Sequence, residues 1–199
     1  MKISELHAIF LRHPVVTTDS RMCPKNSIFF ALKGERFNGN LFASEALKAG
    51  CAYAVVDETV DGMEDERIIR VDNVLTTLQN LATYHREKLK IPIIAITGTN
   101  GKTTTKELIA IGLSREFKVA YTQGNFNNHI GVPLTLLTMN KTHEIGVIEM
   151  GANHLGEIKE LCEIAKPNYG LITNVGKAHL EGFGSFENVI RAKCELYEY

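Results

Sequence analysis

The stretch IIAITGTNGKTTTKE (Ile93–Glu107), with Pro92 directly before it, decides the fold of this chain. Its first four residues, Ile93–Ile96, form a short apolar, β-branched run of the kind that makes a buried strand. A tight turn of small residues follows from Gly98 to Gly101, and residues 103–114 then carry apolar side chains at spacings suited to a helix. The stretch therefore predicts a strand, a glycine-rich turn and a helix in direct succession.

This succession is typical of a phosphate cradle. Backbone N–H groups and the positive end of the helix face the anion, Lys102 reaches the β and γ phosphates, and the Thr103 hydroxyl can hold Mg²⁺. Ile96 stands where the common G-x-x-x-x-G-K-[ST] pattern has its first glycine, so the remaining motif is T-G-T-N-G-K-T. An ordinary strand-to-helix turn with a surface lysine is the alternative, which the flanking elements disfavour. The predicted nucleotide-binding residues are Gly98, Thr99, Asn100, Gly101, Lys102, Thr103 and Thr104.

Composition places the chain among soluble globular proteins. Its 199 residues are 44% hydrophobic and 23% charged, enough to bury a core in one large or two small domains. A formal net charge of -1 gives no electrostatic case for nucleic acid. The four cysteines are scattered without a C-x-x-C pair, which suggests neither a zinc site nor a disulfide framework. The charged N-terminus is unlike a signal peptide, and no apolar run approaches the roughly 20 residues of a membrane span, so we expect a cytoplasmic protein.

Predicted strands alternate with predicted helices throughout, which indicates an α/β fold. In the first half we expect strands at 27–32, 52–56 and 67–71, and helices at 3–11, 41–49 and 74–88. Lys90-Ile91-Pro92 is a reasonable boundary, because charged residues and a proline precede the apolar strand of the cradle. We therefore predict a small N-terminal α/β domain at 1–90 and a second domain with a mainly parallel sheet at 91–199.

In the second half, the ends of predicted strands deliver polar groups. The strand at 118–121 leads into a loop whose amides, among them Asn127 and Asn128, can hold phosphate or sugar oxygens; a plain asparagine-rich turn is the alternative. Glu149 ends the strand at 145–150, where the crevice of an open α/β sheet binds ligands, and its natural role beside a cradle is Mg²⁺ ligation. The alternative for Glu149 is an ion pair with a neighbouring lysine.

The last two predicted elements add two further candidates. A strand at 169–173 delivers a loop that contains His179 on the ligand side of the sheet, which favours contact with metal or phosphate. The final helix, 186–199, carries Lys193, and its sequence alone predicts a solvated lysine. In the first half, Asp19-Ser20-Arg21 and the loop from Lys33 to Asn40 are polar clusters beside strands. Taken alone, these clusters are better read as solvated loops.

Five motifs in order carry a resemblance to a known family. They are TGTNGKTTTKE from Thr97, GNFNNHIGVP from Gly124, EMGANHLGEI from Glu149, NVGKAHLEGFGS from Asn174 and AKCEL from Ala192. Together they resemble the Mur ligases, ATP-dependent enzymes that add amino acids to the peptidoglycan precursor. The resemblance is closest to the members that join D-alanyl-D-alanine to UDP-N-acetylmuramoyl-tripeptide. Upstream, D-S-R at Asp19 and FFALKGERFNGN look like the family's UDP-binding domain, although Asn38-Gly39-Asn40 departs from the D-G-H more usual there.

The resemblance implies a role for each candidate. Lys102 would bind the β and γ phosphates of ATP, Thr103 and Glu149 would ligate a first Mg²⁺, and His179 would help to hold a second. Lys193 matches a lysine that the family carbamoylates with CO₂, which turns an ammonium into an anion able to ligate Mg²⁺. The implied catalytic residues are thus Lys102, Lys193 and His179, and the implied metal ligands are Thr103, Glu149, His179 and Lys193. The implied substrate-binding residues are Ser20, Arg21, Lys33, Gly34, Asn38, Gly39, Asn127 and Asn128.

The implied reaction serves cell-wall biogenesis, and through it cell shape and cell division. The precursor carboxylate attacks the γ-phosphate to give an acyl phosphate and ADP, and the amine of the dipeptide then displaces phosphate. Because the sequence stops within the family's central domain, we expect these residues alone to bind UDP compounds without ligase turnover. We also expect a monomer that contacts neither nucleic acid nor a membrane.

Three alternatives stay open at this point. A sister ligase of the MurE type, or a folylpolyglutamate synthase, shares the cradle and the acyl-phosphate chemistry, although the motifs at Gly124 and Asn174 favour the D-alanyl-D-alanine-adding members. A non-catalytic nucleotide-sugar binding module belongs to a different class, and an open reading frame that continues past Tyr199 would argue against it. A phosphate-loop GTPase switch fits poorly, because its base-reading and switch motifs are not evident.

Overall fold

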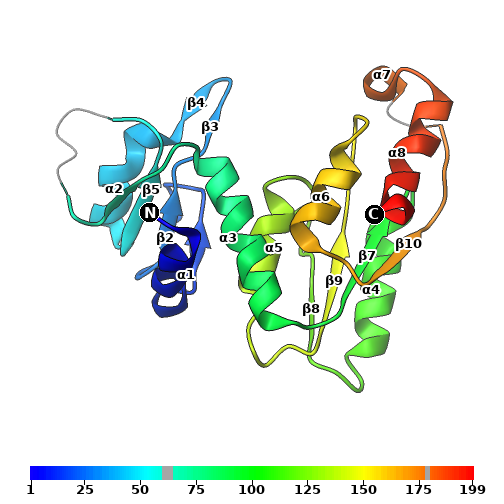
Figure 1. The fold of residues 1–199 in the computed structure, drawn as a ribbon, viewed down its shortest axis with the longest axis horizontal. Helices are drawn as coiled ribbons and strands as arrows, with labels where there is room; N and C mark the ends of the chain where they lie inside the picture. Colours follow the sequence, from blue (N-terminus) through cyan, green and yellow to red (C-terminus); the bar gives the residue numbers. More distant parts are fainter. Residues whose placement is uncertain (60–64, 178–179) are drawn as a thin grey trace. The chain divides into compact units, whose positions relative to one another are not determined.

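The computed structural model describes residues 1–59, 65–177 and 180–199. The chain divides into two compact units, Met1–Tyr84 and His85–Tyr199, and each has a parallel sheet of its own (Figure 1). One long helix, α3 (Val74–Leu89), begins in the first unit and ends in the second. The predicted α/β class with mainly parallel sheets is therefore confirmed.

The first unit is built on a four-stranded parallel sheet with the order β1-β2-β5-β6. Its strands are β1 (Val16–Thr17), β2 (Ile28–Phe30), β5 (Tyr53–Val56) and β6 (Ile68–Arg70). Helices α1 (Ile3–Arg12) and α2 (Ala43–Ala49) belong to this unit together with most of α3. Between β2 and α2 the chain forms a short antiparallel ribbon and a 3₁₀ turn, namely β3 (Lys33–Gly34), β4 (Phe37–Asn38) and η1 (Gly39–Phe42).

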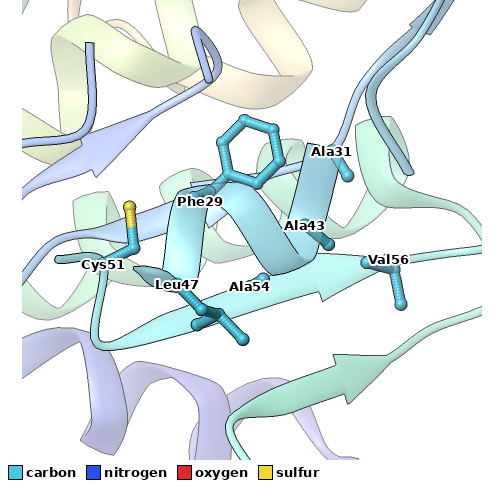
Figure 2. Packing of buried hydrophobic residues seen from close by; sticks show 8 residues of the cluster. Phe29, Ala31, Ala43, Leu47, Cys51, Ala54 and Val56 are labelled. Atoms are coloured by element: carbon cyan, nitrogen blue, oxygen red, sulfur yellow. The ribbon is translucent and has the colours of Figure 1, made fainter. Parts of the chain in front are cut away.

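Apolar residues from β2, α2 and β5 form the core of the first unit (Figure 2). Phe29 on β2 and Val56 on β5 are fully buried, and Leu47 packs onto them from α2. β2 is buried at all three of its positions, as expected for the interior strand of a parallel sheet covered on both faces. This packing holds β2 in place, and the predicted substrate-binding residues Lys33, Gly34, Asn38 and Gly39 follow its carboxyl end.

The second unit has the strand order β10-β7-β9-β8, again all parallel. Its strands are β7 (Ile93–Thr97), β8 (Val119–Tyr121), β9 (Ile145–Glu149) and β10 (Tyr169–Ile172). Its helices are α4 (Lys102–Leu113), α5 (Gly131–Thr138), α6 (Glu157–Ala165), α7 (Leu180–Phe183) and α8 (Phe186–Glu198). The strand β7, which precedes the predicted phosphate loop, thus lies in the interior of the sheet between β10 and β9.

Right-handed crossovers determine which face each helix covers. The β7–α4–β8 connection crosses the sheet in one direction, whereas the connections through α5 and α6 return in the other. Helix α4 therefore covers one face and packs on β8 and β9, while α5, α6 and α8 pack together on the opposite face. This arrangement brings the start of α4, the start of α6 and the middle of α8 to the same edge of the sheet.

One difference from the sequence expectations concerns a buried helix. Helix α5, residues 131–138, was not predicted, because Gly131 and Pro133 read as the end of a loop. Proline is tolerated in the first turn of a helix, and α5 is buried on nearly every side, so it lacks the amphipathic pattern that marks a surface helix. Helix α6 begins at Glu157, after a turn at 151–156. Among the described residues, no helix has both the length and the apolar character that crossing a membrane requires.

Candidate active site

The loop after β7 has the backbone conformation of a phosphate cradle. Gly98 has a φ of +143°, and a Cβ atom at this position would lie 2.1 Å from the Thr173 hydroxyl oxygen, so only glycine fits. Gly101 adopts a left-handed conformation as the N-cap of α4. The first turn of a helix leaves its N–H groups without intrahelical partners, and here that turn consists of Lys102, Thr103 and Thr104. The predicted strand, glycine turn and helix start are all present.

The segment that follows β10 holds this loop in shape. The Thr99 N–H donates to the Asn174 carbonyl oxygen at 3.0 Å, and the Asn100 N–H donates to Asn174 Oδ1 at 3.1 Å. In return, the Thr173 hydroxyl donates to the Asn100 carbonyl oxygen at 2.7 Å. The loop is therefore held in place by hydrogen bonds from the segment after the neighbouring strand β10. Thr173 and Asn174 had no predicted role, since only the fold pairs β10 with β7.

Lys102 curls over the loop that precedes it. Its ammonium donates to the carbonyl oxygens of Gly98, at 2.8 Å, and Thr99, at 3.0 Å. Burial lowers the pKa of Lys102, and the nearby Glu149 carboxylate opposes that shift. The ammonium thus rests on two weak neutral acceptors within a pocket. An anionic oxygen is a stronger partner and could draw it away from them.

Glu149 is the last residue of β9, in register with Ile96 of β7, and its side chain is 2% exposed. Its backbone N–H donates to the Thr122 hydroxyl at 3.0 Å, and its Oε1 accepts from the Asn127 amide at 2.9 Å. Its other carboxylate oxygen, Oε2, is the one buried side-chain N or O atom in the described part of the chain that has no hydrogen-bond partner. A buried carboxylate oxygen without a donor is an orphan that a cation would satisfy.

The residues around Glu149 fit Mg²⁺ rather than a metal held wholly by protein. Mg²⁺ is usually bound through one or two carboxylates, with waters and substrate phosphates completing its shell. No group of three or more His, Cys, Asp and Glu side chains within residues 1–59, 65–177 and 180–199 could hold a metal by itself. One carboxylate oxygen and the Thr103 hydroxyl beside a phosphate cradle match the first pattern. The alternative considered for Glu149, an ion pair with a neighbouring lysine, is not formed among the described residues, and its Oε1 accepts from the Asn127 amide instead.

Lys193 is buried, so the expectation of a solvated lysine was wrong. Its side chain is 3% exposed on α8, and its ammonium lies 5.6 Å from the centre of the Phe183 ring. Burial lowers the pKa of Lys193 to about 8, with a further contribution from the Lys102 ammonium, although Glu157 and Glu195 oppose the shift. Two lysine ammonium groups therefore share one region, which makes it attractive to anions.

A cavity of about 360 Å³ joins these groups. Gly98, Thr99 and Lys102 line it from the phosphate loop, Asn127 and Asn128 from the loop after β8, and Lys193 from α8. The structure thus gathers in one cavity residues that lie almost 100 positions apart in the sequence. Its wall also includes residues without a predicted role: His129, Gly151, Ala152, Asn153, Glu157 and Phe183, which lie within the motifs that carry the family resemblance, and Glu160, Leu161 and Val189, which lie outside them.

The two asparagines have structural partners within this wall. The Asn127 amide donates to Glu149, and the Asn127 carbonyl oxygen accepts from the Gly151 N–H at 2.7 Å. Asn128 Oδ1 accepts from the N–H groups of Ile130, at 3.1 Å, and Gly131, at 2.9 Å, at the start of α5. Their predicted contact with substrate or phosphates stays a prediction. His179, the predicted ligand of a second Mg²⁺, lies outside the described residues.

In the first unit, the predicted cationic groups follow the carboxyl ends of the strands and are already paired. The Arg21 guanidinium, 86% exposed, makes a bidentate contact with Asp19, which holds the pKa of Asp19 at about 2. Lys33 on β3 donates to Glu58 at 2.6 Å, and this contact raises the pKa of Lys33. Both cations lie at the surface, opposite single carboxylates.

The ribbon between β2 and α2 is fixed by amide contacts. Asn38 donates to Glu58 at 2.6 Å and accepts from the Asn40 side chain at 3.0 Å, and Asn40 in turn donates to Asp57 at 2.8 Å. A Cβ atom at Gly39 would lie 2.5 Å from the Leu32 carbonyl oxygen, so the close return of the chain requires glycine. Gly34 ends β3, and Ser20 precedes Arg21 in the turn after β1. The predicted UDP-binding residues thus follow strands β1 and β2 at one edge.

Fold and site together define an α/β protein with a phosphate loop and a neighbouring buried carboxylate. Comparison with models of known protein families identifies the family to which this chain belongs. The family model described as "Mur ligase middle domain" matches residues 96–199, and the model described as "Mur ligase family, catalytic domain" matches residues 14–86. The chain belongs to the Mur ligase family.

Individual relatives are similar over nearly the whole chain. A UDP-N-acetylmuramoyl-tripeptide–D-alanyl-D-alanine ligase of Bacillus subtilis is 44% identical over 182 residues, which cover 91% of this chain and 40% of the relative. The crystal structure of MurF from Acinetobacter baumannii matches with a TM-score of 0.86 at 40% identity, covering 92% of this chain and 40% of that one. The MurF ligase of Thermotoga maritima, solved in complex with ADP, matches with a TM-score of 0.85 at 35% identity, covering 94% and 43%. The chain spans about 40% of the length of the curated relatives that it matches.

Proposed function

We propose that this chain forms the precursor-binding and ATP-binding parts of a ligase that joins D-alanyl-D-alanine to UDP-N-acetylmuramoyl-tripeptide. In this proposal residues 1–90 bind the UDP precursor and residues 91–199 bind ATP. The observation that carries it is the buried oxygen of Glu149 without a hydrogen-bond partner, which belongs to a carboxylate close enough to influence Lys102, a lysine that lines one cavity with Lys193. The names of the most similar relatives supply the substrate class.

The phosphate loop would hold the β and γ phosphates of ATP. The first turn of α4, from Lys102 to Thr104, presents backbone N–H groups and the positive end of the helix, and Lys102 would exchange its two carbonyl partners for phosphate oxygens. Preorganised cations and N–H groups aimed at the transferring phosphoryl group are the main source of catalysis in such reactions.

The Thr103 hydroxyl and Glu149 Oε2 would hold Mg²⁺, and His179 would help to hold a second ion. Bound there, Mg²⁺ supplies positive charge that neutralises the phosphate oxygens. Glu149 is suited to this role, because the Thr122 hydroxyl and the Asn127 amide fix its orientation while one of its oxygens stays without a partner.

Lys193 would be carbamoylated. The neutral amine adds to CO₂, a C–N bond forms, and one proton leaves to solvent, so the product is an anionic carbamate. A pKa of about 8 leaves roughly a tenth of the amine neutral at pH 7, far more than for an exposed lysine. The carbamate would also replace the repulsion between two ammonium groups by an attraction to Lys102.

The reaction then has two steps. A carboxylate oxygen of the tripeptide attacks the γ-phosphorus, and the P–O bond to ADP breaks with the electron pair leaving on ADP. The amine of D-alanyl-D-alanine next attacks the acyl phosphate carbonyl, an amide bond forms, phosphate leaves, and the amine loses a proton to solvent. In both steps Lys102 would stabilise negative charge on the phosphoryl oxygens.

The first unit would hold the UDP group of the precursor. Ser20, Arg21, Lys33, Gly34, Asn38 and Gly39 follow strands β1 and β2. The diphosphate would compete with Asp19 for Arg21 and with Glu58 for Lys33, because each cation already has one carboxylate partner. Such exposed pairs contribute little and can be exchanged. Asn127 and Asn128 would contact the substrate or the ATP phosphates in the second unit. A cytoplasmic monomer that uses ATP completes the proposal.

The test measures ADP release by the full-length protein that carries these residues, with ATP, Mg²⁺ and UDP-N-acetylmuramoyl-tripeptide present. We expect D-alanyl-D-alanine to stimulate ADP release, and single amino acids to have no effect. Stimulation by glutamate or a diamino acid instead would show a sister ligase. No ATP consumption with any acceptor would contradict an enzymatic function.

A further inference from the structure

A second lysine of α4 has no part in the phosphate cradle and is nevertheless buried completely. The Lys106 side chain is 0% exposed, one helical turn beyond Lys102. Its ammonium donates to the Thr122 carbonyl oxygen at 2.6 Å and pairs with Glu107 at 2.8 Å. It also lies 5.6 Å from the centre of the Tyr121 ring. Two of these contacts, with Thr122 and Tyr121, direct the ammonium at the end of β8 and the start of the loop that follows, whereas Glu107 is its neighbour on α4.

Thr122, which receives the bond from Lys106, holds the strand that ends in Glu149. Thr122 is fully buried; its N–H donates to the Val147 carbonyl oxygen at 3.0 Å, and its hydroxyl accepts from the Glu149 N–H at 3.0 Å. A single residue therefore bonds to α4 through its carbonyl oxygen and to Glu149 through its side chain. The path from the Lys106 ammonium to the Glu149 backbone passes through one residue.

The loop that starts at Thr122 returns to the same carboxylate. β8 has only three residues and, as the edge strand, pairs with β9 alone. Five residues after Thr122, the Asn127 amide donates to Glu149 Oε1, and the Asn127 carbonyl oxygen accepts from the Gly151 N–H. An edge strand this short has little pairing of its own to fix its position, so the bond from Lys106 is a substantial part of what holds the loop.

Burying an ammonium group carries a desolvation cost that an apolar side chain of similar volume does not. Replacing a buried ion pair by apolar residues of similar volume is often neutral or stabilising, so packing alone does not account for a lysine at this position. What the ammonium provides, and an apolar side chain would not, is a directed bond from the helix of the phosphate loop to the strand end beside Glu149. Glu107 offsets its charge from a side chain that is 43% exposed.

We propose that Lys106 is a positioning residue for the magnesium carboxylate: through Thr122 it sets the orientation of Glu149 relative to the start of α4. The inference rests on the proposed function of Glu149 as a Mg²⁺ ligand. Lys106 itself contacts neither nucleotide nor metal. Groups of this kind behind a metal ligand typically change metal affinity by 10- to 100-fold when they are altered.

The experiment measures Mn²⁺ affinity, with Mn²⁺ as the stand-in for Mg²⁺, in the full-length protein saturated with ADP. Electron paramagnetic resonance of free Mn²⁺ gives the dissociation constant. We expect Lys106→Met to raise this constant about tenfold, and Thr122→Val, which keeps the shape of the side chain but removes its hydroxyl, to raise it by a similar factor. Because both act on one path, the double variant should be little worse than either single variant.

Glu107→Gln is the matched control. It removes the ion pair of Lys106 but leaves the bond to Thr122, so the Mn²⁺ dissociation constant should stay within about twofold of the wild-type value. Affinity for a UDP compound, which the first unit would bind, monitors the integrity of the protein in every variant. If Lys106→Met does not fold, Thr122→Val alone decides the question.

Four results would overturn the inference. Unchanged Mn²⁺ affinity in a folded Lys106→Met or Thr122→Val variant would show that the path does not position Glu149. A tenfold loss in Glu107→Gln would assign the effect to charge. An equal loss of UDP affinity and Mn²⁺ affinity would show a general structural role. Absence of Mn²⁺ binding by the ADP-saturated wild-type protein would instead refute the proposed function, and the inference with it.

Discussion

Each unit has charged residues near the carboxyl edge of its own parallel sheet, but the burial and the pairing of these charges differ between the two units. In the first unit, Arg21 and Lys33 lie at the surface, and each is paired with a carboxylate. In the second, Glu149 and Lys193 are 2% and 3% exposed; one carboxylate oxygen lacks a partner, and the lysine has a lowered pKa.

Under the proposed function, this difference would separate an edge that binds the precursor from an edge where phosphoryl transfer occurs. Exposed ion pairs contribute little to stability, so a ligand phosphate can replace a carboxylate partner at small cost. Buried groups with perturbed pKa values or missing partners are costly to keep, and they concentrate where chemistry occurs. The contrast predicts large effects from changes in the second unit and small effects from changes in the first.

The largest effect is expected at Lys102. Lys102→Met removes the cation that would stabilise the transferring phosphoryl group, and ADP release by the full-length protein should fall about 10³-fold. UDP affinity should stay unchanged, because Lys102 belongs to the other unit. The exposed Lys118 provides a control, since Lys118→Met should leave ADP release within about twofold of the wild-type rate. A loss of less than tenfold in Lys102→Met would remove the phosphate loop from the mechanism.

The next effect concerns the pH dependence of stability. The pKa of Lys193 falls from 10.5 to about 8 in the folded protein, so between these values the unfolded chain binds more protons than the folded one. The free energy of unfolding should therefore rise with pH across that window, by about 3 kcal/mol for the full shift. Lys193→Met should lack this rise. Urea unfolding of both proteins at pH 7 and pH 10.5 measures this rise in the free energy of unfolding. An equal pH dependence in the two proteins would show that burial does not lower the pKa of Lys193.

A smaller effect is expected at the contact between α8 and α6. Glu195, two residues after Lys193, accepts from the N–H groups of Gly156, at 2.7 Å, and Lys159, at 3.0 Å. It supplies the start of α6 with the cap that Gly156 cannot provide. Glu195→Ala should lower the free energy of unfolding by about 1 kcal/mol, as loss of a helix cap does. Glu195→Gln, which keeps one oxygen acceptor, should lose less, and an equal loss in both variants would favour a role for charge instead.

The smallest effect is expected in the first unit. Glu58→Gln removes the charge that neutralises Lys33, so a UDP diphosphate should bind about threefold more tightly, as measured by calorimetry. Asp65→Asn weakens another exposed pair of this unit, with Arg67, and should not change UDP affinity. Weaker binding in Glu58→Gln would mean that Glu58 supports the β3–β4 ribbon rather than competing for Lys33.

Much of the fold could be predicted because the strands are apolar runs that end in polar turns. β7, β9 and the glycine turn fall where the sequence places them, and Glu149 lies at the predicted edge. Helix α5 was missed, since a helix buried on nearly all sides has no periodic pattern. The pairing of Lys33 with Glu58, 25 positions apart, needed the fold, because no local pattern links such distant residues.

The two buried lysines, Lys106 and Lys193, show why the buried face of a helix was difficult to predict from the sequence. In α8, Lys193 lies four residues after Val189 and three before Leu196, so it shares their buried face, a signal present in the sequence. In α4 the apolar residues do not mark the buried face. Leu108 and Ile111 are 66% and 63% exposed, whereas Lys106 and Ala110 are the buried residues of the helix. A lysine at a core position of a helix indicates a candidate functional residue, and counting apolar residues alone does not detect it.

Crystallography can test directly whether the phosphate loop and Glu149 form one magnesium–nucleotide site. The full-length protein would be crystallised with ADP and Mn²⁺, and the anomalous scattering of Mn²⁺ would locate the metal. We expect a peak at bonding distance, about 2.1 Å, from Glu149 Oε2, with the β-phosphate over the start of α4. A metal bound elsewhere, or a nucleotide that does not contact residues 98–104, would contradict it.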